Sequence, residues 1–143
     1  MSTFTNPKIA AIDVALTELE PSLDEFARCQ GFTLARSHDG SFNVPHRWLH
    51  RDSAGIRHTI GLIIALPMLE RMERGFFPEI PCTLYITASD RTSQKYYDTR
   101  IFEEQPFHSV KVSLSHHLAE ALVKLDACTA DFILHHGVRY NFP

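Results

Sequence analysis

The sequence predicts an α+β domain in which a flat or curved antiparallel sheet of five to six strands packs one face against an N-terminal and a C-terminal helix. Two observations predict this class. Apolar residues recur every three or four positions near both ends of the chain, and between the ends they alternate at every second position. The 143 residues have the size of one domain, so we expect a single domain spanning 1–143.

One apolar stripe predicts an N-terminal helix. Its residues lie three or four positions apart: Ile9, Ile12, Leu16, Leu19, Leu23 and Phe26. Pro21 has no N–H and its ring clashes with the preceding turn, so the helix should kink or restart there. Gly31 should end the helix as a C-cap. We prefer packing against a sheet over a coiled coil, which needs more heptads.

Residues 32–66 predict a three-stranded meander. Both connections, SHDG and DSAG, begin with a polar residue and end with glycine, which favours a three-residue loop with a β-bulge. A two-residue turn at Asp39-Gly40 is the alternative for the first connection. The three-residue loops place apolar residues opposite one another in two cross-strand pairs, Leu34 with Val44 and Trp48 with Ile60.

This register gives the meander two different faces. The face expected to line the core carries Phe32, Leu34, Val44, His46, Trp48, Ile60, Leu62 and Ile64. The face expected to meet solvent carries Arg36, Arg47, Arg51, Arg57 and Thr59. A slip by one residue would send the apolar set to solvent.

The remaining elements follow from periodicity and capping. A short helix is expected from Leu66-Pro67 to Arg74. Alternating apolar residues predict three strands: Cys82–Ser89, Lys95–Phe102 and His108–Leu114. Ser115 should cap a long helix that ends at Gly137, ahead of a short tail at Val138–Phe142. The apolar stripe of that helix is Leu118, Ala121, Leu122, Leu125, Cys128 and Phe132.

Composition excludes several classes of protein. A net charge of −3 argues against an indiscriminate nucleic-acid binder, whose surface should be basic. The longest apolar run, residues 60–66, is too short to span a bilayer, and MSTFTNPK has no apolar signal core. Three widely spaced cysteines predict buried, reduced thiols. We therefore expect a cytoplasmic protein that binds neither membrane nor nucleic acid.

The histidines of the meander are candidate site residues. His50 should face His58 on the core side with Cβ atoms about 5 Å apart, a distance at which two imidazoles can share zinc or copper. No third ligand is evident, so we predict neither a metal nor another cofactor. His46 should lie in the middle of the sheet, where burial favours the neutral imidazole. It could act as a general acid or base, or remain a hydrogen-bonded core residue.

The arginines of the meander are candidates for binding anions. The predicted register sets Arg51 directly opposite Arg57, with Arg47 nearby, and like charges in a cross-strand pair repel. A carboxylate, a phosphate or an acidic protein surface would convert that repulsion into attraction. An ordinary solvated charged face is the alternative interpretation.

No catalytic motif of the GxSxG, P-loop, GxGxxG or Cys–His type is present. A pocket between sheet and helix could bind a small apolar or aromatic ligand through His46, Trp48, His50, His58 and Tyr97, with Tyr85 or Thr99 beside them. We therefore predict a non-catalytic binding or interaction protein, homodimeric, with a small-ligand cleft and a basic hairpin tip. Its partner would be a small molecule or an acidic protein. The alternative is a small-molecule enzyme in which His46 is the general acid/base and Tyr97 assists.

Overall fold

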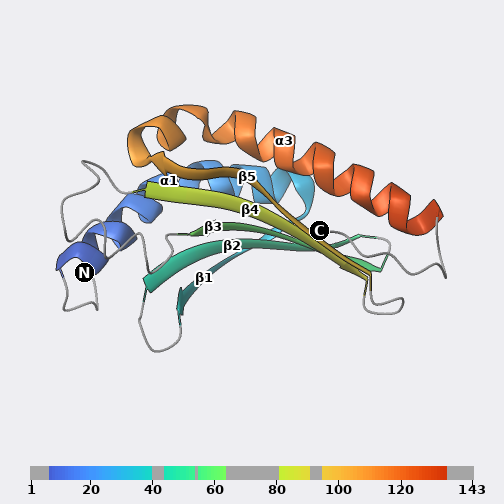
Figure 1. Ribbon diagram of the computed structural model, residues 1–143. Helices are drawn as coiled ribbons and strands as arrows, with labels where there is room; N and C mark the ends of the chain where they lie inside the picture. The colour runs from blue at the N-terminus through green and yellow to red at the C-terminus, as the bar shows by residue number, and fades with distance from the viewer. Residues whose placement is uncertain (1–6, 40–43, 54, 64–80, 91–94, 135–143) are drawn as a thin grey trace.

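The computed structural model describes residues 7–39, 44–53, 55–63, 81–90 and 95–134, and it confirms the predicted α+β class (Figure 1). Helix α1 (Pro7–Gln30) precedes the sheet and helix α3 (Phe107–Leu134) follows it. The strands are β1 (Thr33–Asp39), β2 (Val44–Ser53), β3 (Ile56–Ile63), β4 (Pro81–Asp90) and β5 (Lys95–Pro106). They form one open antiparallel sheet in the order β1-β2-β3-β4-β5. The predicted short helix at 66–74, the stop at Gly137 and the tail at 138–142 lie outside the described residues.

Helix α1 follows the predicted stripe and ends at the predicted cap. It runs through Pro21 as a single element, so the expected restart is wrong. Gly31 has a φ of 75°, and the N–H of Phe32 donates to the carbonyl of Ala27 at 2.9 Å. This six-to-one bond is the mark of a Schellman motif, which a contact between flanking apolar residues usually accompanies. Here the rings of Phe26 and Phe32 lie 5.3 Å apart.

Helix α3 begins earlier than predicted, and the expected strand at His108–Leu114 is wrong. Val110, Leu114 and Leu118 are buried at intervals of four, whereas Val112 is 78% exposed. Val110 and Leu114 fit both the two-residue alternation of a strand and the four-residue spacing of a helix. Only the position of Val112, buried in a strand but exposed in a helix, distinguishes the two. The buried apolar stripe of α3 continues along the helix and packs in the core against the sheet. The residues predicted as a strand are therefore the first turns of this helix.

The predicted register of the first hairpin is wrong. Leu34 lies opposite Leu49, not opposite Val44. Asp39 pairs with Val44 instead, so the connection is longer than the predicted loop and falls on residues 40–43, outside the described residues.

The register of the second hairpin also differs from the prediction, by one residue. Leu49, not Trp48, lies opposite Ile60. Ser53 pairs with Ile56, so two residues connect β2 and β3 where we expected three. Gly55 has a φ of 80°, the left-handed conformation that such a short connection requires.

This one-residue difference exchanges the two faces of β2, because successive side chains of a strand point to opposite sides. Arg47 and Arg51 lie beneath the helices with Leu49, on what we call the helix face. His46, Trp48 and His50 lie on the opposite side, away from α1 and α3, which we call the open face. Figure 1 shows both helices on the same side of the curved sheet.

The core lies between the two helices and the helix face of the sheet. Strand β4 alternates as predicted, with buried apolar side chains at every second position: Cys82, Leu84, Ile86 and Ala88. They pack in one cluster with the stripes of α1 and α3 and with Leu49, Ile60 and Leu62. The open face is therefore the side of the sheet that neither described helix covers.

Candidate functional site

Arg47 is a structural residue beneath α1 and not part of a solvated basic face. Its side chain is 2% exposed. Its guanidinium donates to Glu20 Oε2 at 2.7 Å, to Asp13 Oδ1 at 3.0 Å and to Thr17 Oγ1 at 3.2 Å. Hydrogen bonds from Arg36 and Arg47 outweigh burial and hold the pKa of Glu20 below its ordinary value. The carboxylates of α1 neutralise Arg47, so the prediction that it binds an external anion does not fit its place in the fold.

Arg51 is likewise engaged inside the protein, where it joins both helices to the sheet. It donates to the carbonyl of Gln30 at the end of α1 and to Asp126 of α3, both at 3.0 Å. Its guanidinium also lies 4.4 Å from the ring centroid of Phe32. The remaining contact is with His58, whose Nδ1 lies 2.9 Å from Nη2 of Arg51.

His58 is fully buried on the helix face, and its contacts define its protonation. A guanidinium only donates hydrogen bonds, so Nδ1 of His58 accepts from Arg51 and the proton lies on Nε2. That N–H points at Thr129 Oγ1, 2.5 Å away, and the hydroxyl of Thr129 donates to the carbonyl of Leu125 at 2.9 Å. Burial, and then the charge of Arg51, lower the pKa of His58 below its ordinary value. The neutral imidazole connects β3 to α3.

The predicted facing pair of His50 and His58 is wrong, because the two side chains point to opposite sides of the sheet. His50 lies opposite Thr59, and its Nδ1 is 3.2 Å from the hydroxyl of that residue. Within the described part of the chain, no three His, Cys, Asp or Glu side chains gather as a metal site would require. A shared metal at these two histidines is therefore ruled out by the register.

Aromatic side chains gather in the middle of the open face. The ring of Trp48 lies 5.6 Å from that of the buried His46, and it stacks on His50 at 6.3 Å with planes 12° apart. The ring of Trp48 also lies 5.6 Å from that of Tyr85, in a T-shaped arrangement with 82° between the planes. The sequence analysis grouped Tyr85, or Thr99 in its place, with Trp48 in a pocket under a helix, whereas the structure brings Trp48 and Tyr85 together across β3 on the open face.

Gly61 of β3 makes the contact of Trp48 with Tyr85 possible. It lies between them in the sheet, opposite Trp48 on one side and opposite Tyr85 on the other. A Cβ at this position would fall 2.5 Å from Cε1 of Tyr85 and 2.9 Å from Cζ3 of Trp48. Glycine inside a strand usually marks a close approach, and here the two rings close over it.

A pocket with a volume of about 260 Å³ lies on the open face beside Tyr85. We call it the open-face pocket. Strands β3, β4 and β5 line it through Ile63, Tyr85, Thr87, Tyr96, Asp98, Thr99 and Arg100. The predicted cleft between sheet and helix relied on His46, Trp48 and His50, which the register places on the open face, whereas this pocket opens on the side away from the helices.

Polar and charged groups surround the open-face pocket. Burial, and then the nearby Tyr96, raise the pKa of Tyr85 to about 12, so its phenol stays protonated and can donate a hydrogen bond. The hydroxyl of Tyr96 donates to Asp98 Oδ2 at 3.3 Å. Arg100 pairs with Glu103 at 2.8 Å, and both of these side chains are well exposed. The pocket thus combines an aromatic wall with one negative and one positive group.

The predicted site residues divide between the two faces. Tyr97 lies on the helix face opposite Ala88, so the pocket forms beside its neighbours Tyr96 and Asp98. The sequence analysis did not select Thr87 and Arg100. Alternation along β4 and β5 would have grouped them, but only with the correct register between these strands.

A second pocket of about 310 Å³ lies at the end of the meander, and we call it the basic pocket. Its lining consists of Gly31, Thr33, His50, Arg51, Asp52 and Arg57. Arg57 is 37% exposed and pairs loosely with Asp52 at 3.6 Å. Of the three arginines predicted to bind anions, Arg51 and Arg57 meet here from opposite faces of the sheet, and Arg47 is absent.

Comparison with known proteins adds no relative. No protein-family model, no curated protein and no solved structure matches this chain. None of the helices described is long and apolar enough to cross a membrane. A functional conclusion has to come from the pockets and their chemistry.

Proposed function

We propose that this protein binds a small aromatic molecule in the open-face pocket. The observation that carries the proposal is the aromatic wall, in which Tyr85 lines the pocket and packs beside Gly61 against the ring of Trp48, with 82° between the two ring planes. Ligand sites typically combine aromatic walls with a few polar groups that orient the ligand. A volume of about 260 Å³ lies just below the range for drug-sized ligands, so the ligand is a small, single-ring or two-ring compound.

The polar groups of the pocket indicate what the ligand carries besides its ring. The protonated phenol of Tyr85 donates a hydrogen bond, and the Thr87 hydroxyl donates or accepts one. Asp98 attracts an amine and Arg100 attracts a carboxylate or another anion. A small aromatic compound with an amino group, an acidic group or both fits this set.

Binding can be measured through Trp48, the single tryptophan of the chain, because its ring contacts the wall of the pocket. We expect phenols, arylamines, benzoates or aromatic amino acids to change its fluorescence saturably and to raise the melting temperature. Thr87→Leu fills the pocket and should abolish both responses. Ser89→Leu places a leucine on the same face of β4 at a residue that does not line the pocket, and should retain them. A full panel without a saturable response, or equal binding by T87L, would refute the proposal.

The predicted enzyme remains the alternative function. His46 is buried on the open face beside Trp48, but it is not among the residues that line the open-face pocket, which favours binding over catalysis. Turnover of any ligand found in the fluorescence screen, lost in His46→Ala at unchanged melting temperature, would favour the enzyme.

The basic pocket supports a second binding function, for a small anion. Arg57 and His50 line it together with Arg51, which retains one N–H after its internal bonds. Inorganic phosphate should raise the melting temperature of the wild type and not of Arg57→Glu. An equal shift in both would exclude this pocket. We also expect that the protein binds an acidic protein partner, forms a homodimer and is cytoplasmic.

A further inference from the structure

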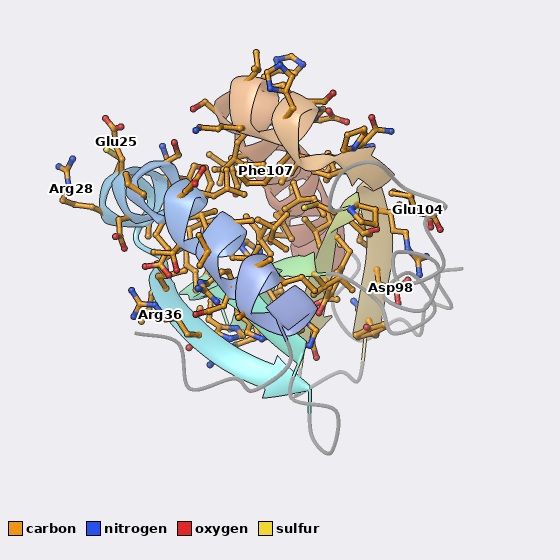
Figure 2. The ribbon with its side chains drawn as sticks, turned by 90° about the vertical axis from the view of Figure 1, so that its left-hand side faces the viewer. Glu25, Arg28, Arg36, Asp98, Glu104 and Phe107 are labelled. Carbon is orange, nitrogen blue, oxygen red and sulfur yellow. The ribbon has the colours of Figure 1, made fainter. Side chains whose placement is uncertain are left out.

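Strand β5 is the last strand of the described sheet and lies at its edge. It is 12 residues long, and among the described strands it pairs only with β4. The outer side of an edge strand presents backbone N–H and C=O groups that can pair with another strand. Figure 2 shows Asp98 and Glu104 on this edge, across the molecule from Arg36 at the β1 edge. The outer side of β5 is therefore the place where the sheet can be extended.

The residues of β5 around Thr99 are complementary to themselves. If two copies of β5 run antiparallel with Thr99 opposite Thr99, Asp98 of each copy lies opposite Arg100 of the other. Both residues lie on the open face, since Asp98 pairs with Thr87 and Arg100 with Tyr85. Opposite charges directly across an antiparallel pair are favourable, and the two-fold axis produces the contact twice.

The next pair outward matches in the same way. Tyr97 lies opposite Ile101 of the other copy, and both side chains already pack against the core of their own copy. An aromatic residue beside a β-branched one is a favourable cross-strand pair. Charge and sheet face therefore agree from Asp98 to Arg100, and the pair of Tyr97 with Ile101 flanks this segment where the first bulge of β5 begins.

The charged groups are available for this contact at little cost. Arg100 is 63% exposed and its partner Glu103 is 60% exposed. Such surface ion pairs contribute little to stability, so Arg100 can exchange Glu103 for a new partner. Asp98 is exposed and accepts a long hydrogen bond of 3.3 Å from the hydroxyl of Tyr96.

The shape of β5 limits the length of the contact. The pairing with β4 shifts by one residue after Arg100 and again before Gln105, so β5 carries two bulges. Glu104, in the second, has a φ of 52°. Bulges bend a strand and end regular pairing, which confines a second strand to the residues around Thr99. An interface of this small size forms reversibly and depends on concentration.

We propose that β5 pairs antiparallel with β5 of a second copy of this chain, about a two-fold axis at Thr99, and so joins the two sheets into one. The open-face pockets of the two copies would then lie next to each other, since Asp98 and Arg100 belong to both the pocket and the contact. Association does not need a ligand, so it can be tested whether or not the pocket binds one.

Sedimentation velocity between about 5 and 500 μM tests the proposal. The wild type should shift from monomer to dimer over this range. Asp98→Arg makes both members of each charged pair arginine, and Arg100→Asp makes both aspartate. Each variant alone should associate at least about ten-fold more weakly, because two attractive contacts become repulsive. The double variant D98R/R100D restores opposite charges and should dimerise again.

Mixing the two single variants gives the sharpest result. In a dimer of D98R with R100D, every charged pair again joins an arginine to an aspartate, so the mixture should form a heterodimer although neither variant dimerises alone. A general folding defect could not produce this recovery. Arg57→Asp changes charge on the open face away from β5 and serves as the control. A wild type that stays monomeric, or single variants that dimerise as the wild type does, would overturn the proposal.

Discussion

Replacing Arg47 with methionine tests whether this residue is a structural part of the core or a surface charge. Arg47 is 2% exposed and bonds Glu20 at 2.7 Å and Asp13 at 3.0 Å. Removing one partner of a buried ion pair costs about 3–5 kcal/mol, because the other charge stays buried without compensation. Arg36 continues to bond Glu20, so we expect the lower end, about 3 kcal/mol.

The expected loss is large enough to measure by thermal or urea unfolding. At about 2–4 °C per kcal/mol for a domain of this size, the melting temperature should fall by about 6–12 °C. Arg57→Met is the matched control on the same hairpin. Its side chain is more exposed and its ion pair is looser, so it should change stability by no more than about 0.5 kcal/mol.

A double variant separates charge from packing. Glu20→Met with Arg47→Met removes both buried charges together, and such replacements are often neutral. We expect it to recover most of the stability that R47M loses. The reasoning would be refuted if R47M cost no more than Arg57→Met, or if the double variant were as unstable as R47M alone.

Three further predictions follow from the structure. The pKa of His58 is lowered in the folded state, so the unfolded state binds the additional proton as the pH falls. Stability should therefore be complete above about pH 6.5 and fall below it by up to about 1.4 kcal/mol per pH unit. His58→Gln should flatten this slope in urea unfolding, and an unchanged slope would contradict the assignment to His58. Gly61→Ala should destabilise the protein by about 2 kcal/mol and alter tryptophan fluorescence, because its Cβ collides with two rings; an unchanged melting curve and spectrum would contradict the close packing. In the native protein, iodoacetamide should modify the exposed Cys29 at once and Cys82 only after unfolding, since burial raises the pKa of the Cys82 thiol to about 12; rapid native labelling of Cys82 in a mass spectrum would show that it is accessible.

Much of the fold was determined by local patterns in the sequence. The stripe from Ile12 to Phe26 and the glycine after it predicted α1 and its end, because both the spacing and the cap depend on neighbouring residues only. The alternation in β4 predicted which of its side chains face the core. Val110 and Leu114 fit both a strand and a helix, so the same reasoning failed at the start of α3.

Tertiary structure decided which face of β2 is buried, and with it the location of the candidate site. Apolar pairing across the hairpins favoured Trp48 on the inside, whereas the fold places Arg47 there. Burying a guanidinium is costly unless carboxylates meet it, and the carboxylates come from Asp13 and Glu20, more than 25 residues earlier in the chain. A rule based on two-residue and three-residue turns contains no information about such distant charges. The sequence by itself therefore determined most of the elements. The buried charges between α1 and β2 accompany the register that turns Trp48 toward the open face, where it meets Tyr85.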